Sequence, residues 1–286
     1  MYDRRQRLIE VFEDTQKFYT EDPALASALA ASRNGTKLYA ADDYPDLDGT
    51  PDREGTVSVT KRKTFEAAME WHSAHPEDRI AVLNFASATR PGGGVKTGSS
   101  AQEESLCRCS TLYPTLDRRW LWQKYYDPNR AAHNNLNTDA CIYSPGIVIC
   151  KTDETFPQRM KQEDWVTVDV ISCAAPNLSP RARIPYNPET GDSMRLPDQA
   201  LYEIQLHRAR HIMHIAAANG VDLLVLGAFG CGAFANDPKI VAKAMKGAVR
   251  SYVNQFDVVE FAIPRDPAAP ANHDAFRAEF KGLAEA

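Results

Sequence analysis

The sequence lacks the features that would place it in a membrane or in an oxidising compartment. No apolar run approaches the roughly 18 residues of a membrane span, and the first residues, MYDRRQRLIEVFEDTQ, have no apolar core of the secretory type. The 6 cysteines are scattered without a CxxC knuckle, so structural zinc is not expected. These absences predict a cytoplasmic protein with reduced thiols and no membrane partner.

An excess of positive charge is also missing. The formal net charge is -5 at pH 7, so the chain lacks the overall basic footprint of proteins that grip duplex DNA or RNA. Any anionic ligand must be held by a local site. The hydrophobic content of 43% is ordinary for a protein with a substantial core, and 286 residues allow one large domain or two small ones.

Short apolar, β-branched segments predict strands in a sheet that is covered on both faces. They are residues 79–85, 147–150, 166–172, 222–226 and 258–263. Helical spacing marks residues 197–219, which Gly220 follows as a cap, and the segment from Pro238 to Tyr252, which Asp237 can cap. The alternation of strands and helices predicts an α/β fold with a mixed or mostly parallel sheet.

Two segments depart from this rhythm. Residues 1–64, with a helix expected from Leu8 to Tyr19, are predicted to form an N-terminal extension packed on a catalytic domain of residues 65–286. Residues 114–138 are polar and aromatic, and we expect them to form an insertion at the rim of a site. Its aromatic residues are expected to pack the insertion: Trp120, Trp122, Tyr125 and Tyr126.

Three consecutive glycines, Gly92, Gly93 and Gly94, follow the first predicted strand. They leave no side chain to keep a ligand off the backbone, so their NH groups can cradle a diphosphate. The loop matches neither the GxGxxG pattern nor a P-loop.

A second glycine loop follows the strand 222–226 and precedes a helix. Ligands of open α/β sheets bind beyond the carboxyl ends of strands, so both loops are expected to face one crevice. Phe229 and Phe234 would offer apolar faces to a ribose or a base. The candidate ligand-binding residues of this loop are Gly227, Phe229, Gly230, Cys231, Gly232, Ala233 and Phe234.

The segment Gln102-Glu103-Glu104 comes soon after the first loop. Adjacent helical side chains point about 100° apart, so the two carboxylates can have different tasks. A carboxyl beside a bound diphosphate and a partly desolvated sugar holds its proton more tightly, as a general acid near neutral pH must. Most acidic pairs are solvated helix faces, but the position of this pair behind the glycine loop favours catalysis.

These motifs resemble, in order and spacing, those of the microbial-type poly(ADP-ribose) glycohydrolases. Gly92–Gly94, seven intervening residues and Gln102–Glu104 are similar to the GGG…QEE signature of that family. Other pieces stand in the expected order: NFAS at 84–87, AAPN at 174–177 and GAFGCGAFANDP at 227–238. The resemblance covers most of the chain.

The resemblance implies a macrodomain-like three-layer fold with a mixed central sheet, and hydrolysis of ribose–ribose bonds in poly(ADP-ribose) with release of ADP-ribose. It makes Glu104 the catalytic acid and Glu103 the partner that bonds ribose hydroxyls. Gln102 supports the pair, and Asn84 is included among the ligand-binding residues. In this mechanism an oxocarbenium-like centre develops beside the diphosphate, and Glu104 then activates water. No cofactor or metal is required, and a monomer is expected.

Several alternatives stay open. A mono-ADP-ribosylhydrolase would release ADP-ribose from modified protein or nucleic acid, and a non-catalytic reader would keep both glycine loops without needing Glu104. Likeness to the short microbial type implies cleavage at the ends of the polymer. The residues alone do not distinguish this from cleavage within the polymer. Cys231 is a weaker candidate as a nucleophile. The histidines His207, His211 and His214 share one face of a predicted helix at a spacing that a metal could use. A metal site there is disfavoured because no carboxylate completes a recognised motif.

Overall fold

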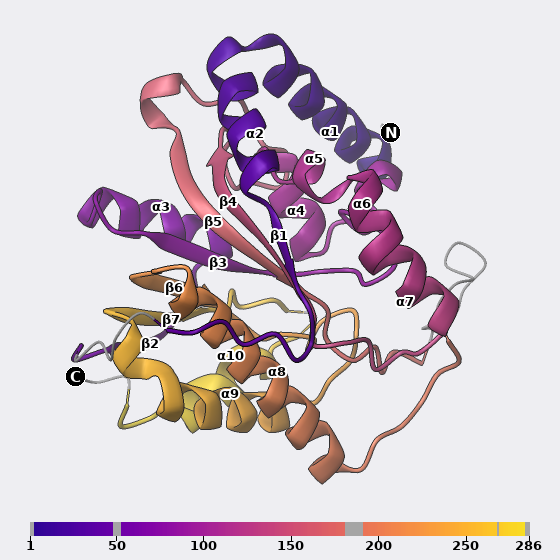
Figure 1. The fold of residues 1–286 in the computed structure, drawn as a ribbon, viewed down its shortest axis with the longest axis vertical. Helices are drawn as coiled ribbons and strands as arrows, with labels where there is room; N and C mark the ends of the chain where they lie inside the picture. The colour runs from indigo at the N-terminus through magenta and orange to yellow at the C-terminus, as the bar shows by residue number, and fades with distance from the viewer. Residues whose placement is uncertain (1–2, 48–52, 181–190, 268, 284–286) are drawn as a thin grey trace.

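The central feature of the protein is a seven-stranded sheet with helices on both faces (Figure 1). The computed structural model describes residues 3–47, 53–180, 191–267 and 269–283. Across the sheet the strands lie in the order β1 (Lys37–Tyr39), β4 (Cys141–Ile149), β5 (Val166–Cys173), β3 (Ile80–Phe85), β6 (Leu223–Leu226), β7 (Val258–Ala262) and β2 (Thr56–Thr60).

Strand direction explains where the site lies. β4 is antiparallel to both β1 and β5, whereas β5, β3, β6, β7 and β2 run parallel to one another. The segments that follow β3, β5, β6 and β7 therefore leave the same edge of the sheet. Both glycine loops are among these segments. The mixed sheet and the α/β fold confirm the fold class predicted from the sequence.

Alternating side chains of the central strand β3 pack into two separate cores, one on each face of the sheet. In β3, Ala81 and Leu83 belong to the core on one face, and Ile80 and Val82 belong to the core on the other. A strand that is buried on both faces reads as a continuous apolar run, which is why the sequence predicts it well.

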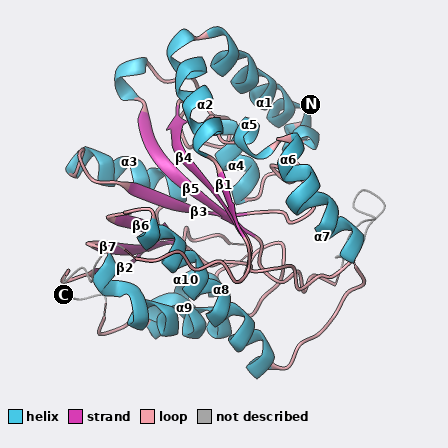
Figure 2. Ribbon diagram, in the orientation of Figure 1, coloured by secondary structure: helices cyan, strands magenta, loops and turns pink. Residues whose placement is uncertain are grey.

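Helices cover both faces, and Figure 2 shows the three layers that result. One face carries α8 (Asp198–Ala218), α9 (Pro238–Tyr252) and α10 (Ala271–Glu279). The other carries α3 (Thr64–Ala74), α4 (Gln102–Cys109), α5 (Tyr113–Leu116), α6 (Arg119–Leu121), η2 (Trp122–Tyr126) and α7 (Asp127–Ala132). Short 3₁₀ turns occur at η1 (Val95–Thr97), η3 (Gln162–Asp164) and η4 (Val253–Gln255). None of the helices in the described residues is long and apolar enough to cross a membrane.

Two N-terminal helices, α1 (Arg4–Glu21) and α2 (Pro23–Gly35), are separated by one residue with two roles. Asp22 ends α1 in an extended conformation, and its carboxylate caps α2 by accepting from the NH groups of Ala24 and Leu25 at 2.9 and 3.1 Å. The hydroxyl of Thr15 in α1 donates to the carbonyl of Arg108 at 2.6 Å. This bond ties α1 to the C-terminal end of α4.

The predicted strands agree with the structure, with one partial exception and two omissions. Residues 147–150 capture only the second half of β4, because the segment Ser144-Pro145-Gly146 interrupts its apolar run and shifts its register. β1 has only three residues, too few for periodicity to reveal, whereas the alternation in β2 is a strand pattern that the prediction missed. Both lie within residues 1–64. That segment supplies the two edge strands of the sheet, while the domain division at residue 64 stays a prediction.

The aromatic segment 114–138 forms α5, α6, η2 and α7 together with the loop that follows. Tyr125 and Tyr126 are buried in the core of this face, and Trp120 and Trp122 pack against it. Four asparagines from this stretch and its loop line a cavity, as expected of a segment at the rim of a site: Asn129, Asn134, Asn135 and Asn137.

Candidate active site

The first glycine loop brings both carboxylates to one point. Gly92 and Gly93 have φ of 67° and 55°, a left-handed conformation that favours glycine. A Cβ atom on Gly93 would lie 2.5 Å from Oε1 of Glu104 and 3.0 Å from Oε2 of Glu103. Glycine is therefore needed here for its backbone conformation and for the space that the two carboxylates occupy.

Glu103 is held from the end of β3. The NH of Ser87 donates to its Oε2 at 2.8 Å, and Nδ2 of Asn84 lies 3.4 Å from its Oε1. Its side chain is buried, and this burial, reinforced by the charge of Glu104, raises the pKa of Glu103 well above its usual value. Hydrogen bonds from Ser87, Asn84 and Gly92 oppose the shift only in part. Glu103 therefore retains its proton to higher pH than a solvent-exposed carboxyl group would.

Glu104 has a different environment. The NH of Gly94 donates to its Oε1 at 2.8 Å, whereas its Oε2 is buried and has no hydrogen-bond partner in the described structure. One oxygen thus fixes the rotamer, and the other is left without a partner. A buried acceptor without a donor is costly, so this atom points to a proton or a ligand group as its partner.

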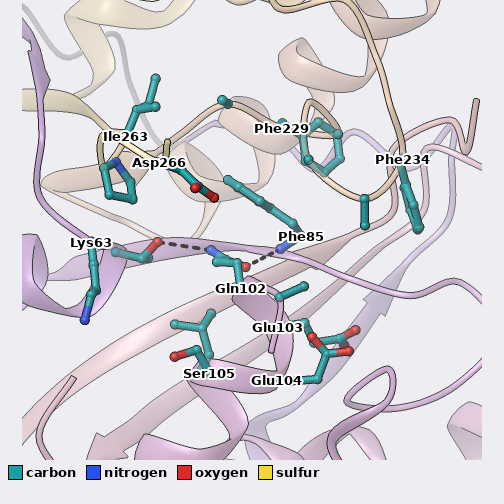
Figure 3. Close-up of a pocket in the computed structure, with 18 of the residues that line it drawn as sticks. Lys63, Phe85, Gln102, Glu103, Glu104, Ser105, Phe229, Phe234, Ile263 and Asp266 are labelled. Carbon is teal, nitrogen blue, oxygen red and sulfur yellow. Dashed lines mark hydrogen bonds between the residues drawn. The ribbon is translucent and has the colours of Figure 1, made fainter. Parts of the chain in front are cut away.

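Gln102 fastens the start of α4 to β3. Its Oε1 accepts from the NH of Phe85 at 2.8 Å, and its Nε2 donates to Thr64 at 3.1 Å (Figure 3). Nε2 also donates to the carbonyl of Leu83 at 2.7 Å. The side-chain amide of Gln102 thus bonds to two backbone groups of β3. This anchor fixes the rotation of α4, and with it the direction in which the next two glutamates point.

The carboxylates lie at one end of a cavity of about 530 Å³. In Figure 3, Glu103, Glu104 and Phe234 lie at one end, and Lys63 and Ile263 lie toward the other. The rings of Phe85 and Phe229 meet edge to face across 5.7 Å between centroids. The cavity therefore combines an apolar wall, exposed backbone and a buried acid pair, a suitable set for a nucleotide-linked sugar.

The second glycine loop is fixed by one buried side chain. Nδ2 of Asn236 lies 2.7 Å from the carbonyl of Pro176 and 3.1 Å from those of Gly230 and Phe234. Gly230 has φ of 78°, and a Cβ there would lie 2.6 Å from Cβ of Ala175. The loop is thus preformed.

Most of the predicted site residues line this cavity: Gly93, Gln102, Glu103, Glu104, Phe229, Gly230, Gly232, Ala233 and Phe234. Gly94 lines a neighbouring cavity instead. Neither cavity is lined by Asn84, Gly92, Gly227 or Cys231. Asn84 lies behind Glu103, and burial raises the pKa of the Cys231 thiol, which disfavours a thiolate nucleophile. Ligand contact by these four residues stays a prediction.

The neighbouring cavity, of about 460 Å³, shares Ser87, Gly93, Glu104 and Phe234 with the first. Ser87 is the clearest residue missing from the predicted site, because its NH holds Glu103. The signal was present, since Ser87 ends the NFAS motif just after β3. Lys63, Ile263 and Asp266 also line the first cavity, but they follow β2 and β7 and carry no recognisable motif.

The three histidines of α8 form hydrogen bonds outside the site. His207 pairs with Asp139 at 2.6 Å, and Nε2 of His211 and of His214 lie 2.9 and 2.7 Å from the carbonyls of Asp43 and Pro45. In the described ranges, no group of three or more His, Cys, Asp or Glu side chains could hold a metal ion. Their hydrogen bonds account for the positions of these rings.

The fold and the site together define a class: an α/β protein that joins a buried acid pair to two preformed glycine loops. Residues 10–152 match the family described as the catalytic domain of microbial-type poly(ADP-ribose) glycohydrolase (PARG). The chain belongs to this family, and it is a glycoside hydrolase acting on poly(ADP-ribose). This confirms the family and the function predicted from the sequence.

Solved structures extend the match beyond residue 152. The PARG of Thermomonospora curvata is 30% identical, with a TM-score of 0.80 over 96% of this chain and 100% of that one. The PARG of Deinococcus radiodurans in complex with ADP-ribose is 35% identical, with a TM-score of 0.73 over 90% and 98%. The Thermomonospora curvata enzyme bound to the inhibitor ADP-HPD is 29% identical, with a TM-score of 0.78. No curated protein matches the chain.

Proposed function

We propose that this chain releases ADP-ribose from poly(ADP-ribose) by using Glu104 as general acid and Glu103 as the ligand of the sugar. The observation that carries the assignment is the contrast between the two side chains. Both oxygens of Glu103 face hydrogen-bond donors, whereas Glu104 keeps one buried oxygen without a partner. Of the two glutamates, only Glu104 lines both cavities. It therefore borders the spaces on both sides of a bond to be cleaved.

The bound unit would occupy the first cavity. Its diphosphate would lie against the backbone of the two glycine loops, and its adenosine would extend past Phe85 and Phe229 toward Lys63 and Ile263. The reacting ribose would then sit at Gly93, beside both carboxylates. Complexes of the Deinococcus radiodurans PARG with ADP-ribose support a site of this kind.

In the proposed reaction Glu104 acts first as the general acid and then as the general base. Glu104 gives its proton to the glycosidic oxygen as the bond from this oxygen to the anomeric carbon breaks, which leaves an oxocarbenium-like ribose and a free hydroxyl on the departing unit. Glu104, now ionised, takes a proton from water as the water oxygen attacks the anomeric carbon. Glu103 holds hydroxyls of the same ribose. No other co-reactant is required.

Two finer properties belong to the proposal. All six cysteines are free and buried, which supports a reducing compartment such as the cytoplasm. The monomer stays a proposal, tested by light scattering of the purified protein.

The test is release of ADP-ribose from purified poly(ADP-ribose), measured for the wild type, Glu104→Gln and Glu103→Gln. We expect Glu104→Gln to lower kcat by about 10²- to 10⁴-fold, with ADP-ribose binding retained in calorimetry. Glu103→Gln should weaken ADP-ribose binding as well. Binding without release by the wild type would overturn the glycohydrolase assignment, and release from a mono-ADP-ribosylated protein alone would favour the narrower hydrolase.

A further inference from the structure

Arg108 is a buried cation one helical turn beyond the proposed acid. It lies in α4, four residues after Glu104, so the two side chains are neighbours on the same side of the helix. The residue is only 3% exposed. Burial lowers the pKa of the Arg108 guanidinium, and the charge of Glu104 opposes this shift more than any other group does. Glu104 is therefore the main counter-charge of Arg108.

A chain of hydrogen bonds connects the guanidinium of Arg108 to Glu104. Its Nη1 donates to the carbonyl of Ser99 at 2.7 Å. The NH of Ser99 donates to the carbonyl of Gly94 at 3.1 Å, and the NH of Gly94 donates to Oε1 of Glu104 at 2.8 Å. Arg108 thus fixes one end of the turn from Gly94 to Ser99, and the other end of this turn orients the acid.

Helix α1 holds the same two segments together from outside. The carbonyl of Arg5 lies so close to Gly98 that a Cβ there would be 2.4 Å away, and φ of Gly98 is 74°. Only a glycine allows this approach. The hydroxyl of Thr15 donates to the carbonyl of Arg108, as described above. The turn and the end of α4 are therefore fixed relative to each other before any ligand binds.

The positive charge of Arg108 has no ion pair to explain it. Among the described residues no carboxylate forms a salt bridge with this guanidinium, and a buried cation without one costs more than an apolar side chain of similar size. A neutral donor could make the bond to Ser99. In the proposed reaction, however, Glu104 becomes a carboxylate, and a fixed positive charge in a buried site stabilises such an ion.

We propose that Arg108 is a positioning residue of the reaction, which holds the turn that orients Glu104 and supplies the positive charge that offsets its ionised form. The inference rests on the proposed function, because it takes Glu104 as the group that gives up a proton and later takes one. Arg108 lines neither cavity. It therefore acts through Ser99, Gly94 and Glu104, and ligand binding does not depend on it directly.

The test measures kcat on purified poly(ADP-ribose) and the Kd for ADP-ribose in three variants. Arg108→Met removes the charge and the donor, Arg108→Gln keeps a donor, and Arg108→Lys keeps a donor and the charge. We expect kcat to fall on the order of 100-fold in Arg108→Met, less in Arg108→Gln and least in Arg108→Lys. The Kd, measured by calorimetry, should change by less than about twofold in all three.

Lys151→Met is the matched control, because Lys151 is a second buried cation that bonds to α1. It is 1% exposed, and its Nζ lies 3.0 Å from the carbonyl of Val11 and 2.7 Å from Oδ2 of Asp14. Like Arg108, it lines neither cavity. No bond of its side chain leads to the glycine loop, so this variant should lose stability and keep the wild-type kcat at a temperature where it is folded.

Wild-type kcat in Arg108→Met and Arg108→Gln would overturn the inference. So would an equal loss of kcat in all three variants, or a rise in Kd that parallels the loss, because each indicates a role in folding alone. If Arg108→Met does not fold, the comparison of Arg108→Lys with Arg108→Gln decides. A wild type that releases no ADP-ribose removes the proposed function and this inference with it, whereas an active wild type with fully active variants removes the role of Arg108 alone.

Discussion

Gly94 and Glu104 are joined by one hydrogen bond, of 2.8 Å from the glycine NH to Oε1 of the glutamate. This bond uses one oxygen of the carboxylate and leaves the other buried without a partner, in a residue that lines both cavities. The glycine-rich loop therefore does more than receive a ligand, because its backbone also sets the orientation of the acid.

Replacing Gly93 with alanine should disable the acid pair. The added methyl would meet Oε1 of Glu104 at 2.5 Å and displace it, so we expect kcat/KM to fall on the order of 100-fold. The left-handed backbone at φ 55° should cost about 1–2 kcal/mol of stability. The control is Gly220→Ala, which has φ 68° but no atom within 4 Å of the added Cβ. It should lose stability alone, and an equal loss of activity would contradict the prediction.

Gly232→Ala should separate binding from stability. No protein atom lies within 4 Å of a Cβ at Gly232, and the residue lines the first cavity. The free energy of unfolding should stay within about 0.5 kcal/mol of the wild type. We expect the Kd for ADP-ribose, measured by calorimetry, to rise about tenfold, because the methyl would stand between backbone and diphosphate. Unaltered affinity would show that the ligand does not approach this loop.

The raised pKa of Glu103 makes stability depend on pH. Its unperturbed value is 4.5, so above that pH the unfolded chain loses a proton that the folded protein keeps. Stability must then fall as pH rises from about 4.5 through the raised pKa. Glu103→Gln removes this loss. In urea titrations the variant should exceed the wild type at about pH 8 and approach it near pH 4.5; a difference that is constant with pH would refute this.

Glu260 is a buried carboxylate whose paired cation, Arg62, can be removed by substitution. It is 0% exposed and accepts from Arg62 at 2.9 and 3.1 Å and from Trp71 at 2.5 Å. Arg62→Met should destabilise the protein by about 3–5 kcal/mol, because it leaves the carboxylate without its cation. Glu70→Gln, which removes only the exposed partner of Arg62, should cost about 1 kcal/mol or less in the same urea titration.

The chemistry of the first cavity could be predicted because its residues are local in sequence. Gly93 and Glu104 are eleven positions apart, and the loop after β6 carries its own glycines, so motif spacing identifies both. Burial on both faces likewise reveals β3 and β6. Asn84 has a contact that no motif indicates, since its amide lies against Glu103 and Ser172, while its predicted contact with a ligand stays a prediction.

The neighbouring cavity could not be predicted in the same way. Arg5, Asn135 and Asn177 come from three distant segments, and of the three only Asn177 belongs to a motif, the AAPN segment at 174–177. Asparagines in loops are ordinarily interpreted as turn residues. Only the packing of α1 on Gly98 and the buried bonds of Arg208 bring these side chains to one rim.

The pairing of β2 with β7 places Thr56 beside Val258. During synthesis β2 leaves the ribosome long before its partner exists, and the edge of β6 stays open until β7 is made. So distant a contact favours slow folding. A protease that cut just before Val258 would therefore remove two strands from the sheet, one from each half of the chain. It would also loosen Lys63 and Ile263, and so destroy one end of the first cavity while leaving the glutamates covalently intact.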